Sequence, residues 1–420
     1  MSVFHHDSER WFQALTLAGW LGVVASTRFV HAGRLARAGR TVNWRALTLI
    51  FGTFVGIYSL VALAMAPAFA RALPLFAALH VTVYINFLAL LRPSMRSRVY
   101  LALVGWPAAF FTAGTLFALP WALARGLGFE PWAPWLPYAL ALVGMIQSLV
   151  TSRQTIDVVA GGPRGAAIAL LGPHPRGAQR EKRPLRIVQI SDPHLGPFMS
   201  VARLRQIATR AVEAKPDLIL LTGDFLTLDS QGDPNLLVEA LAPLRAFPGR
   251  VFACRGNHDL EAPEIVAHAT SANGIQLLVD QAVVLETEGG RVQIVGMDFV
   301  FRDREAHLTR VCAEHPRAPD AFRIILLHDP GAFKHLPSGE GDLVLAGHTH
   351  GGQVGLLSLG LPWTFLRLFA GRKIPDHGFW ARGTDRMWVH RGTGHYGFPL
   401  RLGVPAEESV LLVHRPETAA

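Results

Sequence analysis

Cysteine is scarce in this chain, which holds only Cys254 and Cys312 among 420 residues. Two cysteines support neither a disulfide framework nor a cysteine-ligated zinc site. Both are expected to be buried thiols that pack as small apolar side chains. The chemistry of the chain must therefore come from other residue types.

Charged residues are also few, at 17% of the sequence, whereas soluble domains carry about 25%. The hydrophobic share is 50% and the mean hydropathy is +0.28. Apolar residues gather in the first third, which indicates a membrane part. The net charge is +9, but the arginines lie beside apolar runs, so they fit membrane topology better than nucleic-acid binding, and no nucleic-acid partner is expected.

Residues 1–152 are predicted to form a transmembrane helical region. Pro134 and Pro137 crowd the start of its last apolar segment, which is the least regular. His80 and Asn86 lie inside the third segment, where polar residues are either functional or hydrogen-bonded to a neighbouring helix; we favour the second role. The five predicted spans are 11–27, 46–70, 72–91, 99–124 and 132–150.

Arginines between these segments predict the orientation of the chain. Basic loops stay in the cytoplasm, and alternate loops hold little beyond Arg71 and Arg125. Five spans therefore predict a multi-pass protein of the inner or plasma membrane, with its N-terminus outside and its C-terminal domain in the cytoplasm. The basic residues that carry this prediction are Arg28, Arg34, Arg37, Arg40, Arg45, Arg92, Arg96, Arg98, Arg153, Arg164, Arg176, Arg180, Lys182 and Arg183.

Residues 153–184 are basic and rich in Gly and Pro, and they predict a linker along the membrane surface. A second domain is expected over 185–415. Its apolar runs alternate with helical patterns and then with hairpin patterns, which is typical of a layered α/β sandwich. Strands are predicted at 185–190, 217–221, 251–254, 283–286, 292–295, 322–327, 342–346, 388–390 and 409–413, and helices at 201–214, 234–245 and 262–273.

Polar clusters follow directly after five of these strands. In α/β sheets, ligands bind beyond the carboxyl ends of the strands. Imidazole and carboxylate groups suit Zn, Mn or Fe, and seven ligands are enough for two ions that share one of them. The clusters are Asp192-Pro-His194, Gly223-Asp224, Gly256-Asn257-His258-Asp259, His328, and Gly347-His348-Thr349-His350-Gly351-Gly352-Gln353.

This ordered set of motifs resembles the calcineurin-like metallophosphoesterase superfamily. The resemblance implies a four-layer αββα sandwich and two divalent metal ions, with Mn, Fe, Zn and Mg as the candidates. It implies that one ion is held by Asp192, His194 and His350, that the other is held by Asn257, His328 and His348, and that Asp224 bridges them.

The resemblance further implies that His258 stabilises the transition state or protonates the leaving oxygen, and that Asp259 orients it. Taken singly, Asp259 also suits the N-cap of a helix, and His258 also suits a hydrogen-bonded surface position. A metal-bound hydroxide is the expected nucleophile.

The glycine-rich motif is most similar to a membrane-associated branch of the superfamily. That branch includes bacterial phosphodiesterases, a pyrophosphatase acting on UDP-2,3-diacylglucosamine, and transmembrane proteins with a metallophosphoesterase domain. Residues 355–380 form an apolar, aromatic insertion after the motif, which is either a lip that enters the bilayer surface or a helix packed on the sandwich.

The expected function is hydrolysis of a phosphodiester or pyrophosphate bond by a membrane-anchored enzyme, with the bilayer as partner and a lipid-linked phosphate as one substrate class. A phosphoprotein phosphatase and a metal-free scaffold on a membrane protein are the alternatives. Lost ligands would indicate the scaffold, and none is lost here.

Overall fold

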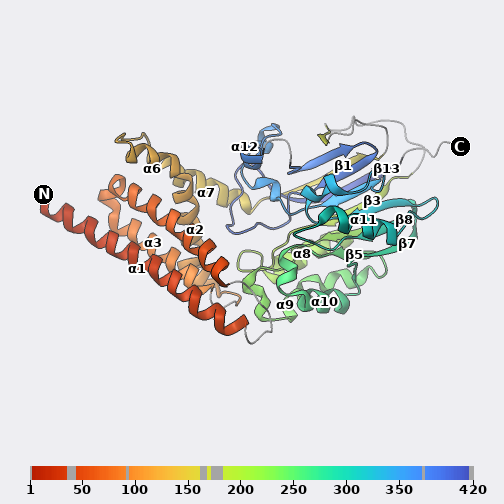
Figure 1. The fold of residues 1–420 in the computed structure, drawn as a ribbon, viewed down its shortest axis with the longest axis horizontal. Coiled ribbons are helices and arrows are strands. Elements are labelled where there is room, and N and C mark those ends of the chain that lie inside the picture. Colours follow the sequence, from red (N-terminus) through yellow and green to blue (C-terminus); the bar gives the residue numbers. More distant parts are fainter. Residues whose placement is uncertain are drawn as a thin grey trace. The chain divides into compact units, whose positions relative to one another are not determined.

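The computed structural model describes residues 2–35, 44–90, 94–160, 168–171, 183–370 and 374–415. It forms two compact units, Met1–Ile146 and Gln147–Ala420 (Figure 1). The first unit is helical in its described residues. Its helices are α1 (Ser2–Leu35), α2 (Trp44–Met65), η1 (Ala66–Ala72), α3 (Leu73–Ala89), α4 (Arg98–Tyr100), the π-helical turn η2 (Leu101–Gly105), α5 (Trp106–Phe117), α6 (Leu119–Gly126) and α7 (Leu136–Ser148).

Two helical stretches of the described residues are long and apolar enough to cross a membrane. They are Thr48–Ala89 and Arg98–Phe117, and Leu136–Ser148 is apolar but shorter. These helices suggest membrane association, and the number of crossings stays a prediction.

The first stretch is folded back on itself. The backbone of Phe69 leaves the helical region at φ −112° and ψ 24°, and beyond it α3 packs against α2. The Tyr58 hydroxyl lies 2.7 Å from Nδ1 of His80, whose Nε2 lies 3.0 Å from Oγ1 of Thr16 on α1. Asn86 accepts a hydrogen bond from the Tyr100 hydroxyl at 3.3 Å. The predicted helix-to-helix hydrogen bonds of His80 and Asn86 are therefore confirmed.

The second unit contains two mixed sheets in its described residues. One has the strand order β1-β13-β3-β4-β5-β6 and the other β2-β11-β12-β10-β9-β8-β7. The strands are β1 (Thr151–Val159), β2 (Ala169–Leu170), β3 (Leu185–Ile190), β4 (Leu218–Thr222), β5 (Val251–Cys254), β6 (Gln276–Leu277), β7 (Gln281–Thr287), β8 (Gly290–Gly296), β9 (Phe322–Leu326), β10 (Leu343–Ala346), β11 (Gly378–Arg382), β12 (Asp385–Val389) and β13 (Ala406–His414).

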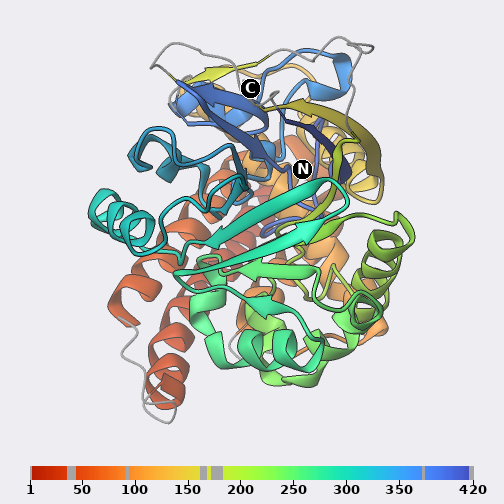
Figure 2. The same ribbon diagram turned by 90° about the vertical axis from the view of Figure 1, so that its right-hand side faces the viewer.

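Helices cover the outer faces of the two sheets, as Figure 2 shows. One core lies between the six-stranded sheet and helices α8 to α10, a second lies between the two sheets, and a third joins the seven-stranded sheet to α11 and η6. The layers thus follow the order helix, sheet, sheet, helix. The helices are α8 (Val201–Glu213), α9 (Asn235–Leu241), α10 (Pro263–Ala272), α11 (Arg304–Glu314) and α12 (Phe365–Ala370), with 3₁₀ turns η3 (Leu228–Gly232), η4 (Ala242–Ala246), η5 (His258–Glu261), η6 (Pro330–His335), η7 (His350–Gly352) and η8 (Leu357–Leu359).

The structure differs from the predicted linker over 153–184. Residues 153–159 form most of β1, which pairs in parallel with β13, because Thr155, Ile156, Val158 and Val159 suit a half-buried strand. Ala169–Leu170 form β2 at the edge of the other sheet. Residues 161–167 and 172–182 lie outside the described residues.

Candidate metal centre

The predicted ligands come from strands whose carboxyl ends meet at one edge. Strands β3, β4 and β5 are parallel neighbours, and β8, β9, β10 and β12 are parallel neighbours in the facing sheet. Each polar cluster follows the last residue of such a strand, so side chains far apart in sequence converge there.

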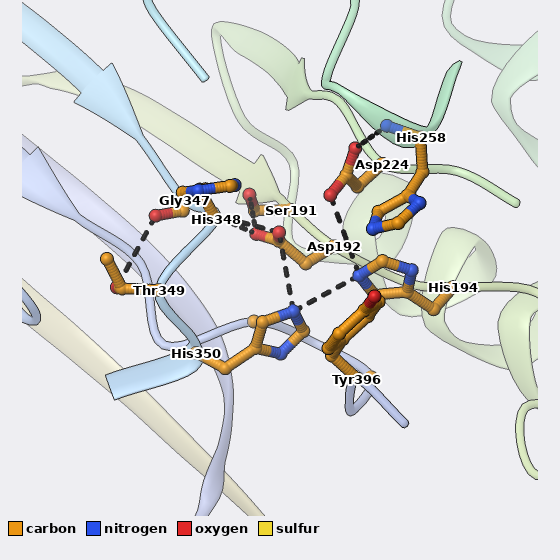
Figure 3. A network of polar contacts seen from close by, with 12 residues as sticks. Ser191, Asp192, His194, Asp224, His258, Gly347, His348, Thr349, His350 and Tyr396 are labelled. Atoms are coloured by element: carbon orange, nitrogen blue, oxygen red, sulfur yellow. Dashed lines mark hydrogen bonds and ion pairs between the residues drawn. The ribbon is translucent and has the colours of Figure 1, made fainter. Parts of the chain in front are cut away.

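The first group of candidate ligands is Asp192, His194 and His350, whose ligand atoms all lie within 4.8 Å of one another. Nε2 of His194 is 3.1 Å from Nε2 of His350, which is 3.5 Å from Oδ1 of Asp192 (Figure 3). All three residues are buried. Three converging nitrogen and oxygen donors are the start of a metal coordination shell.

The second group is Asp224, His328 and His348, which meet the same distance limit. Nε2 of His328 lies 3.2 Å from Oδ2 of Asp224 and 3.2 Å from Nδ1 of His348. The same Oδ2 atom is 3.7 Å from Nε2 of His194 in the first group. Asp224 therefore stands between the two groups, where a bridging carboxylate would have to be.

Backbone conformation at the candidate ligands is unusual. Five of them adopt positive φ, a region that side chains other than glycine seldom occupy and that clusters at functional sites. Short loops of this kind turn each side chain back over the strand ends. These residues are Asp192 (51°), His194 (46°), Asp224 (55°), His348 (68°) and His350 (51°).

Two glycines leave room for the carboxylates. A Cβ atom on Gly347 would lie 2.1 Å from Oδ2 of Asp192, and one on Gly256 would lie 2.2 Å from Oδ1 of Asp224. Any larger residue at either position would displace the carboxylate, so steric constraints require glycine at both.

Surrounding polar groups orient the ligands. His328 donates from Nδ1 to the carbonyl oxygen of Thr222 at 2.6 Å, which leaves Nε2 facing Asp224. Asp192 accepts from the Ser191 hydroxyl at 2.5 Å and from the backbone N–H of His348 at 2.9 Å. Such outer contacts fix ligand rings and carboxylates in a metal site.

The electrostatics of the centre favour a bound cation. Burial lowers the pKa of His194 to about 4 and raises the pKa of Asp192. Burial opposes ionisation of Asp224 as well, but His328 and His194 hold the pKa of this carboxyl well below its usual range. Burial also lowers the pKa of His328, yet Asp224 outweighs it and raises that pKa to about 10. His194 is thus a neutral imidazole beside the ionised Asp224 carboxylate, and a divalent ion bound there would take the place of the proton on His328.

Asn257 gives a direct test of fit, because amide oxygens are seldom buried without a partner. Its Oδ1 atom is buried and has no hydrogen-bond donor among the described residues. A cation at the second group would satisfy this atom, and the residues present therefore fit a dimetal centre.

His258 lies at the open side of the centre, next to Asp224. Its backbone N–H donates to Oδ1 of Asp224 at 2.9 Å, and its Nδ1 lies 2.9 Å from Oε1 of Glu261. Burial opposes the imidazolium, but Glu261 and Asp224 outweigh burial and raise the pKa of His258. The ring is thus suited to donate a proton.

The Asp259 carboxylate contacts backbone groups and not the ring of His258, and its predicted orienting role stays a prediction. It accepts backbone N–H groups of Asp224, Phe225 and Gly256 at 2.7 to 2.8 Å, so it braces the loop that carries Asp224. Glu261, which the motifs did not indicate, makes the hydrogen-bond contact with the ring of His258. The i, i+3 spacing within η5 was the only available signal for it.

Two aromatic residues that the motifs also missed border the centre. Phe299 lies with its ring centroid 6.1 Å from that of His328 and 6.2 Å from that of His348. Tyr396 lies 4.9 Å from the ring of His258 and 5.4 Å from that of His194. Both follow strand ends, β8 and β12, but no metal-binding residue type marks them.

Comparison with known proteins agrees with this geometry. A family model described as calcineurin-like phosphoesterase matches residues 185–352. Phosphodiesterase YaeI of Escherichia coli is 30% identical over 238 residues, which cover 54% of this chain and 82% of that protein.

Two further relatives carry informative names. A transmembrane protein with metallophosphoesterase domain from Danio rerio is 29% identical over 239 residues, covering 53% of this chain and 52% of that protein. The UDP-2,3-diacylglucosamine pyrophosphatase LpxG of Chlamydia muridarum is 28% identical over 268 residues, covering 50% of this chain and 78% of that protein.

Proposed function

Because this chain belongs to the calcineurin-like phosphoesterase family, we propose that it is a membrane-anchored dimetal phosphohydrolase that cleaves a phosphodiester or pyrophosphate bond of a lipid-linked substrate. The observation that carries the proposal is the position of Asp224, whose Oδ2 atom faces His194 at 3.7 Å and His328 at 3.2 Å. One carboxylate oxygen between two sets of donors is the geometry of a shared ligand.

The proposed ligand sets follow from the two groups and from Asn257. Asp192, His194 and His350 would hold one ion, and Asn257, His328 and His348 the other, with Asp224 between them. A pair of divalent ions supplies Lewis acidity toward phosphoryl oxygens and lowers the pKa of water near it. Mn, Fe, Zn and Mg all remain candidates for this donor set.

The protein's own part in the reaction is to hold charge and to move a proton. Asp224 stays ionised beside the histidines, so the substrate phosphate meets a fixed arrangement of charge that needs no reorganisation. His258 donates a proton to the departing oxygen, and Glu261 holds its Nδ1 so that Nε2 is free for that donation. Gln231 donates to Oε2 of Glu261 at 3.0 Å and so holds the Glu261 carboxylate in place.

The lipid-linked substrate is inferred from the apolar insertion over 355–380. Its described part includes η8 and α12, and several large apolar side chains there remain exposed although the residues around them are folded. Thr364 at its centre is buried and donates to Asp376, whose carbonyl accepts from Thr349 of the glycine-rich motif at 2.7 Å. The exposed side chains are Leu359 (73%), Leu361 (51%), Trp363 (40%), Phe365 (46%) and Leu368 (59%).

An exposed apolar surface attached to the metal-binding motif suits the interface of a bilayer. One relative is named for a diacylated glucosamine substrate, and another is named a transmembrane protein. With the arginine pattern, these findings support a multi-pass protein whose catalytic domain faces the cytoplasm.

The full chain, purified in detergent, should be assayed against nucleotide phosphodiesters, a sugar-nucleotide lipid and phospholipids. We expect hydrolysis of a diester or pyrophosphate, loss of that activity after chelation, and its return with Mn²⁺. Hydrolysis of phosphoserine peptides alone would instead indicate a phosphoprotein phosphatase. No hydrolysis with any added metal would contradict the proposal.

A further inference from the structure

The last residue of the glycine-rich motif, Gln353, holds a loop from another part of the sheet. Its Oε1 accepts the backbone N–H of Tyr396 at 2.8 Å, and its Nε2 donates to the carbonyl oxygen of the same residue at 3.1 Å. Gln353 itself has a left-handed backbone, with φ 57°. A two-point clamp on one residue fixes the direction in which the side chain of that residue leaves the backbone.

The clamped side chain lies over the metal centre. The Tyr396 ring centroid is 4.9 Å from His258, 5.4 Å from His194 and 6.3 Å from His350. Figure 3 shows its phenol oxygen turned toward the rings of His194 and His258. These three rings belong to the first ligand group and to the proton donor, so the phenol stands between the two.

Tyr396 also faces solvent, which the residues of the first ligand group do not. It is 53% exposed, whereas His194 and His350 are each 3% exposed. None of the hydrogen bonds found among the described residues involves its hydroxyl, so that hydroxyl is available to bind a ligand. An exposed donor at the rim of the proposed metal centre is placed to meet a substrate that enters it.

We propose that Tyr396 contacts the substrate, with its hydroxyl donating a hydrogen bond to a non-bridging oxygen of the phosphoryl group, and that Gln353 is a positioning residue that acts through Tyr396. This inference rests on the proposed phosphohydrolase function. It gives the final glutamine of the motif a role that metal binding does not explain.

Tyr396→Phe tests the hydroxyl alone, because the ring and the clamped backbone remain. A hydrogen bond to a charged oxygen is worth about 10- to 100-fold, so we expect kcat/KM for aryl phosphodiesters to fall by that factor. The loss should be the same for leaving groups of low and high pKa, and inorganic phosphate should inhibit more weakly by a similar factor. Metal content should stay at the wild-type value.

His258→Gln provides the contrast, because loss of a proton donor to the leaving oxygen should grow with the pKa of the leaving group. Tyr100→Phe, in the other unit, is the control and should keep wild-type kinetics. Gln353→Leu should lower kcat/KM in the wild type but have much less effect in the Tyr396→Phe background, because residues that act together are not additive.

Wild-type kinetics and wild-type phosphate inhibition in Tyr396→Phe would overturn the role of the hydroxyl while leaving the proposed function intact. A loss that depends on the leaving group would assign Tyr396 to the leaving oxygen instead and overturn the proposal in this form. A wild-type chain that hydrolyses none of the phosphodiesters would remove the proposed function and this inference together.

Discussion

At the scale of single residues, Asp224 faces both candidate ligand groups. Oδ2 faces a histidine from each group, and Oδ1 accepts the backbone N–H of His258. The side chain is almost fully buried. Removing this carboxylate takes away the one oxygen that faces a histidine of each group, so we expect its loss to affect both proposed ion positions.

Asp224→Ala should therefore abolish hydrolysis, with kcat lower by on the order of 1,000-fold, and should reduce the bound metal below two ions per chain. Elemental analysis of the purified protein and phosphodiester kinetics measure the two effects. The matched control is Asp320→Ala, because Asp320 also has a positive φ (56° against 55°) but is exposed before the start of β9. A variant at Asp224 that keeps two ions and full activity would rule out the shared-ligand role.

Glu407 gives a prediction for stability against pH. This carboxyl is buried on β13 and accepts hydrogen bonds from Nε of Arg391 at 2.9 Å and from the Ser409 hydroxyl at 2.7 Å. Burial alone would raise its pKa, but His390 and Arg391 outweigh burial and lower the pKa of Glu407 to about 2. The ionised form is thus favoured in the folded state.

The pKa of Glu407 is lower in the folded state than in the unfolded chain. The ionised carboxylate therefore stabilises the folded state fully above pH about 4.5, and this stabilisation is lost as the pH falls to about 2. Glu407→Gln should lower the free energy of unfolding by roughly 2–3 kcal/mol at pH 7, and the difference from wild type should shrink across that window. Guanidinium denaturation of the full chain in detergent measures it. Glu305→Gln, at a side chain that is 80% exposed, should change little; a difference for Glu407 that stays constant down to pH 2 would be inconsistent with this account.

Sequence alone was a good guide to residues whose chemistry and place along a strand coincide. Asp192 and His348 each follow an apolar run, and such a run predicts where a sheet ends. Glu261 and Tyr396 do not directly follow an apolar run. They approach His258 because of a 3₁₀ turn and a loop after β12. Long-range packing decides positions of that kind, and no local pattern specifies it.

At the scale of elements, the insertion over 355–380 joins an exposed apolar surface to a buried anchor. Thr364 and Asp376 fix it to the glycine-rich motif, so its surface side chains can be changed without removing the anchor. Replacing Leu359, Trp363 and Leu368 with Ser should lower activity on a lipid-linked substrate in vesicles by about 10-fold or more, since each buried apolar side chain is worth about 1.5–3 kcal/mol.

Activity of this triple variant on a soluble aryl diester should stay near that of the wild type. Val284→Ser is the control, because Val284 is 40% exposed on β7, outside the insertion. Equal losses on soluble and lipid substrates would make the insertion a structural element only.

Elements with strong periodicity were predicted nearly to the residue, as β3 and β5 show. Helix α9 was predicted as one helix over 234–245, but it passes into a 3₁₀ turn at Ala242, where Pro243 lacks a backbone N–H. Helix α11 was not predicted, because its only buried apolar residues are Leu308, Val311 and Cys312. Strand β1 was missed because its Arg, Gln and Asp residues resemble the basic segment that follows. It is a strand because it pairs with β13, which lies some 250 residues away in the sequence, and no local pattern predicts that pairing.

At the scale of the whole molecule, the arginine distribution predicts that the loop between α6 and α7 faces away from the cytoplasm and the catalytic unit faces it. The chain suits a labelling test, because its two native cysteines are both buried. Glu130 lies between α6 and α7 with a side chain that is 79% exposed, and Glu305 on α11 is 80% exposed.

Cysteine at either position should react with a thiol reagent once membranes are opened. In intact cells a membrane-impermeant maleimide should label Glu130→Cys, whereas Glu305→Cys should react only after permeabilisation. The unaltered chain is the control and should stay unlabelled in both conditions. Five crossings put these two sites on opposite sides of the membrane, and four would put them on the same side. Labelling of both sites in intact cells would therefore rule out the fifth span. It would place the phosphohydrolase outside, where only substrates of the outer leaflet could reach it.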